Sequence, residues 1–314
     1  MAHLQLTSNR LPLTLVLVVL CLSTRADRGP RPWPGAKSVA MSFADVMPQT
    51  VLWAWEEPED LRSAPESVGV AYLAETLFLG KSATAAPALT VVKRRQPLAV
   101  TPRAAVMAVV RVIALPGFQD SPTIREQTAG ALAEVSHRAD LRALQIDFDA
   151  TRSQRAFYAA VLSLLRARMP ATMPLSMTAL LSWCAASPGS GNWLSGLPID
   201  EAVPMFFRLG GNARLGDSKS GYPLREEHCR GSFGISTDEN WPTLDPHARI
   251  YLFAPRPWTP LQLAALAGIP RGRRAPALQF DYAKSKLHSP NDTGLRVDNK
   301  SAVPAENPSE ESLQ

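Results

Sequence analysis

Two aspartates, Asp147 and Asp149, stand two positions apart at the end of the apolar run ALQIDFDAT, residues 143–151. Successive side chains of a β-strand point to opposite faces, so these two carboxylates and Gln145 share one face. The opposite face carries Leu144, Ile146 and Phe148. Two carboxylates so close together raise the pKa of one of them, as general acid–base catalysis requires. The pair is therefore our first candidate for a catalytic site.

The two aspartates are expected to differ in depth. Asp147 lies deeper in the strand and should accept a hydrogen bond, because an unpaired buried carboxylate is costly. Asp149 should lie nearer solvent, close to a tryptophan or to Arg208, and should contact the substrate. An alternative is that Asp147 only caps the helix that follows.

The strands that must position these residues are eight apolar runs, several of them nearly continuous, as buried parallel strands are. They cover residues 51–55, 69–79, 107–115, 141–149, 175–183, 201–209, 231–238 and 249–255. Helical patterns stand between the later runs, at 121–135, 153–168 and 259–267. Eight strands with helices between them over this length predict an α/β fold, a single (β/α)₈ barrel of the TIM type.

Two of the predicted strands are irregular. The stretch 69–100 could form a β-hairpin with VVKRRQPLAV as its return strand, and the segment 210–228 before strand 7 is rich in glycine. The competing fold is a doubly wound open sheet. That fold normally has a glycine-rich phosphate loop after its first strand, where this chain has WAWEEPED.

The C-terminal ends of barrel strands form the site in this fold. Tryptophan faces stack on sugar rings, and carboxylates and arginines bind hydroxyl groups, so we expect a carbohydrate site there. The predicted catalytic residues are Asp147, Asp149, Glu56 and Glu239. The predicted substrate-binding residues are Trp53, Trp55, Trp183, Arg208, Asp238, Trp241 and Arg256, with Trp193 and Trp258 on the same rim. The alternative for the tryptophans is packing in the core.

The sequence lacks the residue patterns of metal sites, serine hydrolases and nucleotide-binding loops. The five histidines are dispersed, so we expect no metal site, and there is no G-x-S-x-G, G-x-G-x-x-G or Walker motif. No cofactor is therefore expected. The net charge is +5 with scattered lysines and arginines, which does not favour nucleic-acid binding.

The two ends of the chain differ from its middle. Arg10 precedes LPLTLVLVVLCL, and Ala26 closes a short stretch typical of a cleavage site, which predicts a signal peptide over 1–26. A Pro-rich spacer (27–37), the barrel domain (38–283) and a disordered tail (284–314) follow. We expect a periplasmic or secreted protein with no membrane span after cleavage. An uncleaved anchor, or a lipoprotein acylated at Cys21, are the alternatives.

Export makes a disulfide between Cys184 and Cys229 feasible. In a regular barrel, however, Cys184 follows strand 5 at the top and Cys229 precedes strand 7 at the bottom. A strand separates those ends by about 23 Å, whereas a disulfide needs Cα atoms within about 7 Å. If the two are bonded, segment 210–230 must stay at the top and strand 7 must enter irregularly.

Several segments together resemble a family of exported bacterial proteins with a domain of unknown function (DUF3142-like). They are LQIDFDATRSQRAFYAAVLSLLR, PLSMTALLSWC, LPIDEAVPMFFRLG, CRGSFGISTDE and RIYLFAPRPW, and they span roughly residues 50–258. The resemblance implies a TIM-type barrel related to glycoside hydrolases. It transfers no established activity.

The stretch IDFDAT is also similar to the D-x-D-x-E motif of chitinase-like hydrolases, with Asp147 and Asp149 at its two aspartates. Thr151 stands where that motif has its general acid. Either Glu56 or Glu239 then supplies the proton, or the barrel binds a glycan without cutting it. The hypotheses are thus a glycoside hydrolase-like enzyme, a non-catalytic glycan- or peptidoglycan-binding barrel, and an envelope interaction protein.

Overall fold

The computed structural model describes residues 43–81, 87–185, 192–207, 224–239, 241 and 245–267. The predicted signal peptide, spacer and tail lie outside these residues, as does Arg208. No helix in the described part of the chain is long and apolar enough to cross a membrane.

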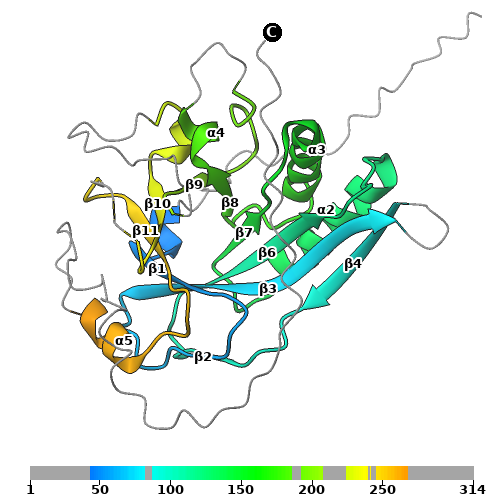
Figure 1. Cartoon of the computed structure of the whole chain (residues 1–314). Coiled ribbons are helices and arrows are strands. Elements are labelled where there is room, and N and C mark those ends of the chain that lie inside the picture. The colour runs from blue at the N-terminus through cyan, green and yellow to red at the C-terminus, as the bar shows by residue number, and fades with distance from the viewer. Residues whose placement is uncertain are drawn as a thin grey trace, which may run out of the picture. The chain divides into compact units, whose positions relative to one another are not determined.

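Eight parallel strands close into a barrel (Figure 1). They are β1 (Thr50–Ala54), β3 (Val68–Lys81), β6 (Val106–Ala114), β7 (Ala143–Asp147), β8 (Leu175–Leu180), β9 (Glu201–Met205), β10 (Ser232–Ser236) and β11 (Arg249–Phe253). Strand β1 pairs with both β3 and β11, which closes the ring. The predicted barrel is confirmed, each of its strands overlaps a predicted run, and the open sheet is wrong.

The expected hairpin exists without changing the strand count. Strand β3 continues past the barrel and pairs antiparallel with β4 (Pro87–Lys93), which lies outside the ring (Figure 1). The register of β3 against β6 shifts between Leu73 and Glu75, so strand 2 is irregular as predicted. Two short strands, β2 (Glu59–Asp60) and β5 (Leu98–Ala99), form a separate parallel pair below the mouth-side loops.

Helices pack on the outside of several strands. Helix α1 (Phe43–Val46) precedes β1. The α-helices that follow β1 are α2 (Pro122–Ser136), α3 (Arg155–Arg166), α4 (Leu181–Ala185) and α5 (Pro260–Leu266). Two short 3₁₀ helices are η1 (Arg152–Gln154) and η2 (Glu227–Cys229). Ser121 caps α2 and Thr259 caps α5, each followed by proline in the first turn. Leu144, Ile146 and Phe148 of the β7 segment lie in the outer core with α2 and α3.

The barrel interior is filled by side chains from alternate strand positions, as in other barrels of this type. Trp53 stacks on Tyr251 with ring centroids 5.4 Å apart, and its Nε1 donates to Gln145 Oε1 at 3.0 Å. A Cβ at Gly234 would lie 2.8 Å from Met205 Sδ and 2.9 Å from the Trp53 ring, so only glycine fits there. These residues form a floor between the two ends of the barrel.

Below this floor lies a buried ion pair. Arg249 Nη1 donates to Glu201 Oε1 at 2.5 Å, and the Tyr251 hydroxyl donates to Glu201 Oε2 at 2.6 Å. Arg249 also donates to the carbonyls of Pro48 and Met47, which fixes α1 beneath the barrel. Both charges are satisfied within the protein, as buried charges must be.

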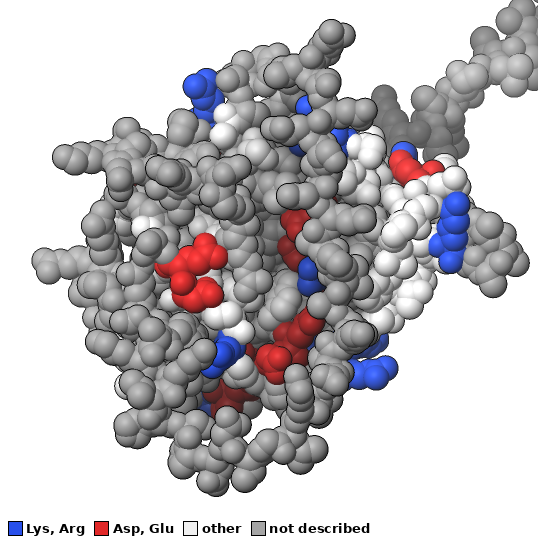
Figure 2. Space-filling model, in the orientation of Figure 1, with Lys and Arg blue, Asp and Glu red and all other residues white. Residues whose placement is uncertain are grey.

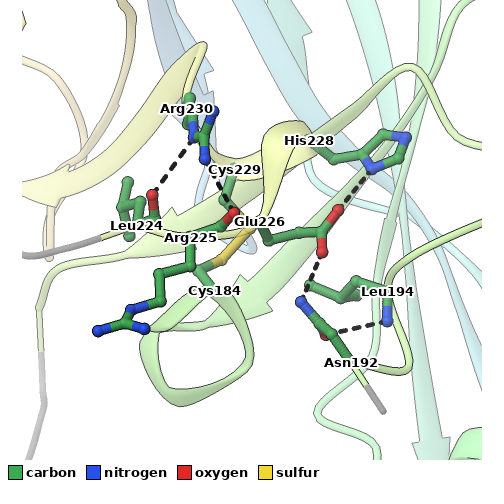
Figure 3. The surroundings of a disulfide bond; sticks show 9 residues. All are labelled: Cys184, Asn192, Leu194, Leu224, Arg225, Glu226, His228, Cys229 and Arg230. Atoms are coloured by element: carbon green, nitrogen blue, oxygen red, sulfur yellow. Dashed lines mark hydrogen bonds and ion pairs between the residues drawn. A yellow bond between two sulfur atoms is a disulfide. The ribbon is translucent and has the colours of Figure 1, made fainter. Parts of the chain in front are cut away.

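Cys184 and Cys229 form a disulfide with Cα atoms 5.8 Å apart (Figure 3). The expected 23 Å separation fails because α4 begins directly at the end of β8 and packs against β9, as η2 also does. The two cysteines therefore meet in the outer core, beside the wall of the barrel. Strand 7 does enter irregularly, through η2; residues 210–223 of the segment lie outside the described residues.

Hydrogen bonds reinforce this crosslink (Figure 3). The backbone N–H groups of Arg225 and Glu226 both donate to the Cys184 carbonyl, at 2.9 and 3.2 Å. The buried Glu226 carboxylate accepts from Asn192 Nδ2 at 2.5 Å and lies 3.0 Å from His228 Nδ1. The segment before β10 is thus tied to α4 through its backbone as well as through sulfur.

Candidate functional site

Asp147 is the last residue of β7, and its side chain points into the barrel at the mouth. Gln145, two positions earlier, is fully buried in the interior and donates to Ser176 Oγ at 3.0 Å, so the predicted alternation of faces is confirmed. Asp147 Oδ1 accepts from Thr178 Oγ1 of β8 at 2.7 Å. Its Oδ2 lies 3.7 Å from Arg111 Nε of β6. The deeper aspartate therefore has the donor that its position required.

The environment of Asp147 favours the protonated form. Burial raises the pKa of its carboxyl and the nearby Asp149 carboxylate raises that pKa further, while the Thr178 hydrogen bond and the Arg111 charge oppose the rise. The side chain still keeps 16% of its surface exposed. A carboxyl with a raised pKa that solvent can reach is suited to donate or accept a proton.

Arg111 is the centre of the mouth cluster, which we define as Trp55, Glu56, Arg111, Asp147 and Thr178. Arg111 stands in register with Asp147 on the neighbouring strand. Its Nη1 lies 3.9 Å from Glu56 Oε1, and its guanidinium lies 5.6 Å from the centroid of the Trp55 ring. One arginine thus contacts two carboxylates and one indole, and brings β1 and β7 residues together.

Asp149 and Thr151 lie just past this cluster. Asp149 is exposed, as predicted, and its charge acts on Asp147. Thr151 is exposed and caps η1, and its backbone N–H donates to Gln154 Oε1 at 2.9 Å. The position of the chitinase-type general acid is therefore the start of a helix. The predicted neighbour Arg208 lies outside the described residues.

The predicted residues after β10 and β11 follow the mouth ends of these strands, and the contacts described for Asp238 and Trp241 are with Ser236. The Ser236 hydroxyl donates to Asp238, which is exposed, and Trp241 Nε1 donates to the Ser236 carbonyl at 2.7 Å. Glu239 is partly buried and Arg256 is exposed. Trp241 packs against the outer core, and Asp238 presents an exposed carboxylate to solvent.

The predicted tryptophan rim is largely wrong. Trp53 is 3% exposed and forms part of the floor, because its side chain points into the barrel interior from within β1. Trp183 is equally buried, in α4, and packs edge-on against Trp193 in the outer core. Trp258 is buried and donates to the Trp53 carbonyl at 3.2 Å. Trp55 is the tryptophan that remains at the mouth, partly exposed.

Two phenylalanines, Phe207 and Phe253, supply aromatic surface at the mouth in place of the predicted tryptophans. Phe207 and Phe253 stack with ring centroids 5.4 Å apart and planes 3° apart, and both are partly exposed beside the interior cluster. Phe207 also meets Trp53 edge-on at 6.3 Å. The mouth therefore combines an apolar wall on the β9–β11 side with charged residues on the β1–β8 side.

A buried glutamate in the connection after β1 was not predicted. Glu59 is 7% exposed, and its Oε2 accepts from the Trp258 backbone N–H at 3.0 Å. Burial raises the pKa of Glu59 to about 7, which that hydrogen bond and the Arg94 charge oppose. Arg111 and Thr178 were also missed; the sequence signal was a lone polar residue inside an apolar strand.

A cavity lies at the other end of the barrel. It measures about 650 Å³ and is lined by residues of α1 and by the N-terminal ends of β9 and β11, including Phe43, Glu201 and Arg249. Its buried charges are already satisfied by one another, so chemistry favours the mouth as the site. No group of three or more histidine, cysteine or acidic residues that could hold a metal ion occurs among the residues the structure describes.

Charges of both signs occupy the face shown in Figure 2. The acidic and basic side chains of the described residues lie there in small, interspersed groups. That part of the surface has no continuous basic stripe of the kind that nucleic-acid binding uses.

A family model covers the central part of this site. Residues 101–199 match the model of a domain of unknown function, DUF3142. The predicted resemblance is confirmed over that range. The DUF3142 match includes Arg111, Asp147 and Thr178, three of the five residues of the mouth cluster.

Two solved structures are similar in fold. One is the chitinase domain of the spore coat protein CotE from Clostridium difficile, with 14% identity, coverage of 64% of this chain and 62% of that chain, and a TM-score of 0.35. The other is a family GH18 chitinase from Chromobacterium violaceum, with 10% identity, coverage of 68% and 81%, and a TM-score of 0.41. The chain thus spans less than two thirds of the first domain. No curated protein matches the sequence.

Proposed function

We propose that the barrel mouth binds a glycan and hydrolyses it with a pair of carboxylates, one of which is Asp147. The observation that carries the proposal is the position of this carboxyl. It is inside the mouth, oriented by Thr178 and Arg111, partly exposed, and its pKa is raised by burial. Glycosidases use one carboxylic acid of this kind together with a second carboxylate.

Glu56 and Asp149 are the two candidates for the second carboxylate. Glu56 contacts the same guanidinium as Asp147, so the two carboxyls are close enough for the separations of about 5–9.5 Å that glycosidases use. Asp149 is exposed and lies two residues past the end of β7. Arg111 and Asp149 would hydrogen-bond sugar hydroxyls, and Trp55 would stack on an apolar sugar face.

A second candidate function is glycan binding without cleavage. The observation that favours it is Thr151, a helix cap where the chitinase-type motif carries its acid.

We also propose that the protein acts outside the cytoplasm, in the periplasm or as a secreted protein, with cell-wall glycan as its ligand class. The apolar segment near the N-terminus is of signal-peptide length. A buried disulfide between Cys184 and Cys229 supports export, because such bonds persist in oxidising compartments.

A hydrolysis and binding screen tests both functions. The purified protein is incubated with chitin oligosaccharides, other polysaccharides and peptidoglycan, and reducing ends and bound protein are measured. We expect Asp147→Asn to abolish hydrolysis, and either Asp149→Asn or Glu56→Gln to do the same. Asp140→Asn is the control, because Asp140 is an exposed carboxylate before β7, at the other end of the barrel. Binding without release of reducing ends would favour the second function, and neither would reject the proposal.

A further inference from the structure

The loop that carries Trp55 and Glu56 is held by an arginine from outside the barrel ring. Arg94 directly follows β4, the return strand of the hairpin. Its Nη1 donates to the carbonyls of Trp55 and, at 3.4 Å, Ala54. Its Nη2 donates to the Glu57 carbonyl at 2.5 Å. One guanidinium therefore binds three carbonyls within four consecutive residues.

These hydrogen bonds take over where the strand pairing of β1 ends. Strand β1 ends at Ala54, and its pairing with β11 ends one residue earlier, at Trp53. The bonds to the Ala54 and Trp55 carbonyls are partly buried, and these carbonyls need other donors because unpaired backbone groups are costly where water is excluded. The bond to the Glu57 carbonyl is exposed to solvent. The Trp258 indole serves the Trp53 carbonyl, and Arg94 serves the next ones. Side chains thus fix the path of residues 54–57.

The position of Arg94 is itself fixed. Its Nε donates to the Gln96 carbonyl at 2.9 Å, within the turn that leads to β5. Its backbone N–H donates to the Ala74 carbonyl at 2.8 Å, at the irregular point of β3. The buried carboxyl of Glu59 lies close enough to interact with its charge. The guanidinium is held from both sides and can hold the loop in turn.

We propose that Arg94 is a positioning residue of the glycan site, which orients Trp55 and Glu56 toward Arg111 and Asp147. The inference rests on the proposed function only for what the mouth binds. The Arg94 side chain binds the backbone carbonyl of Trp55, and it acts on the mouth cluster through the path of this backbone. The hairpin β3–β4, which the barrel does not need for closure, then has a role at the mouth.

The geometry makes the arginine specific. A planar guanidinium presents several N–H donors in a fixed fork, whereas a lysine ammonium is a single point of charge. Arg94→Lys should keep the charge near Glu59 and lose part of the carbonyl clamp. Arg94→Gln should lose both. Arg95→Gln is the matched control, because Arg95 is the exposed neighbour of Arg94 in the same segment.

The test measures backbone amide exchange by mass spectrometry together with glycan kinetics and thermal stability. For Arg94→Gln we expect faster exchange over 54–58 with the barrel strands unchanged. The KM or Kd for a chitin oligosaccharide or a peptidoglycan fragment, whichever the wild type binds, should rise about tenfold or more with a smaller change in kcat. Arg94→Lys should be intermediate and Arg95→Gln should match the wild type.

Two results would overturn the inference. One is wild-type exchange over 54–58 in Arg94→Gln. The other is faster exchange throughout the barrel with KM or Kd unchanged, which would make Arg94 a general stabilising residue. If the wild type binds no glycan, the proposed function fails by itself. The exchange over 54–58 then decides alone whether Arg94 holds this loop.

Discussion

The Thr178 hydroxyl donates a 2.7 Å hydrogen bond to Asp147, across the boundary between two neighbouring barrel strands. Arg111 approaches the same carboxyl from the strand on the other side. The carboxyl is therefore oriented by residues of β6 and β8, both rigid parts of the barrel wall. This is the arrangement that a reacting group needs, since sites on strands hold their geometry better than sites on loops.

Replacing Thr178 by valine should raise the pKa of Asp147, because it removes a hydrogen bond that stabilises the ionised carboxylate. An NMR titration of the Asp147 carboxyl carbon measures this without needing a substrate. Thr178→Ser keeps the hydroxyl and should titrate like the wild type. A valine variant with the wild-type titration would contradict the role we give this bond.

Glu59 should make the stability of the protein depend on pH. Its pKa is raised from 4.5 to about 7, so the folded state holds this proton more tightly than the unfolded state does. Its contribution is complete below about pH 4.5 and is lost as the pH rises through about 7. Glu59→Gln does not titrate and can still accept the hydrogen bond of the Trp258 N–H.

Urea unfolding at several pH values tests this. The free energy of unfolding of Glu59→Gln, minus that of the wild type, should rise between about pH 5 and pH 8 by on the order of 2 kcal/mol, after allowance for solvent screening. Glu66→Gln is the control, because Glu66 is an exposed glutamate in the same region. A difference that stays flat with pH would mean that Glu59 titrates normally.

Trp53 and Trp55 should separate stability from binding. Trp53→Phe leaves Gln145 without its indole donor and should lower the free energy of unfolding by about 1–3 kcal/mol, with glycan binding nearly unchanged. Trp55→Ala should weaken glycan binding at least about tenfold, or 1.4 kcal/mol, with a smaller effect on the free energy of unfolding. Thermal unfolding and a glycan titration are measured on both variants. Equal effects of the two substitutions on glycan binding would contradict the assignment of Trp53 to the floor and Trp55 to the mouth.

Removing the disulfide should destabilise the fold. The crosslink closes a loop with a sequence separation of 45, for which the chain-entropy model gives about 4 kcal/mol. In a domain of this size that corresponds to a fall in Tm of roughly 8–16 °C. A reducing agent should produce this fall in the wild type and none in the double variant Cys184→Ala/Cys229→Ala. An unchanged Tm on reduction would show that the remaining contacts of α4 suffice.

The strands were predictable because their composition follows from burial on both faces. The apolar runs that become β6 and β8 are buried by the interior on one side and by helices on the other. The hairpin was predictable in outline but not in its bounds: VVKRRQPLAV (91–100) was the expected return strand, whereas β4 covers Pro87–Lys93 and shares residues 91–93 with it. Pairing partners, by contrast, depend on the ring as a whole.

The site was predictable only in part. Asp147 and Asp149 could be placed by alternation alone, since strand direction and period decide which face they share. The tryptophans could not, because residue type does not distinguish a position inside the strand, such as Trp53, from one just past its end, such as Trp55. Arg94 was unreadable for a different reason: its partners are backbone carbonyls far away in the sequence, which leave no pattern.

The bond between Cys184 and Cys229 also determines what a protease can achieve. All of β9 and the start of η2 lie between the two cysteines. A single cut anywhere in that interval leaves two polypeptides that remain covalently joined, with β10, β11 and α5 still attached to the N-terminal strands. Such a nicked protein would run as one band on a non-reducing gel and as two after reduction. The barrel can thus lose the continuity of its backbone there without losing any of its strands.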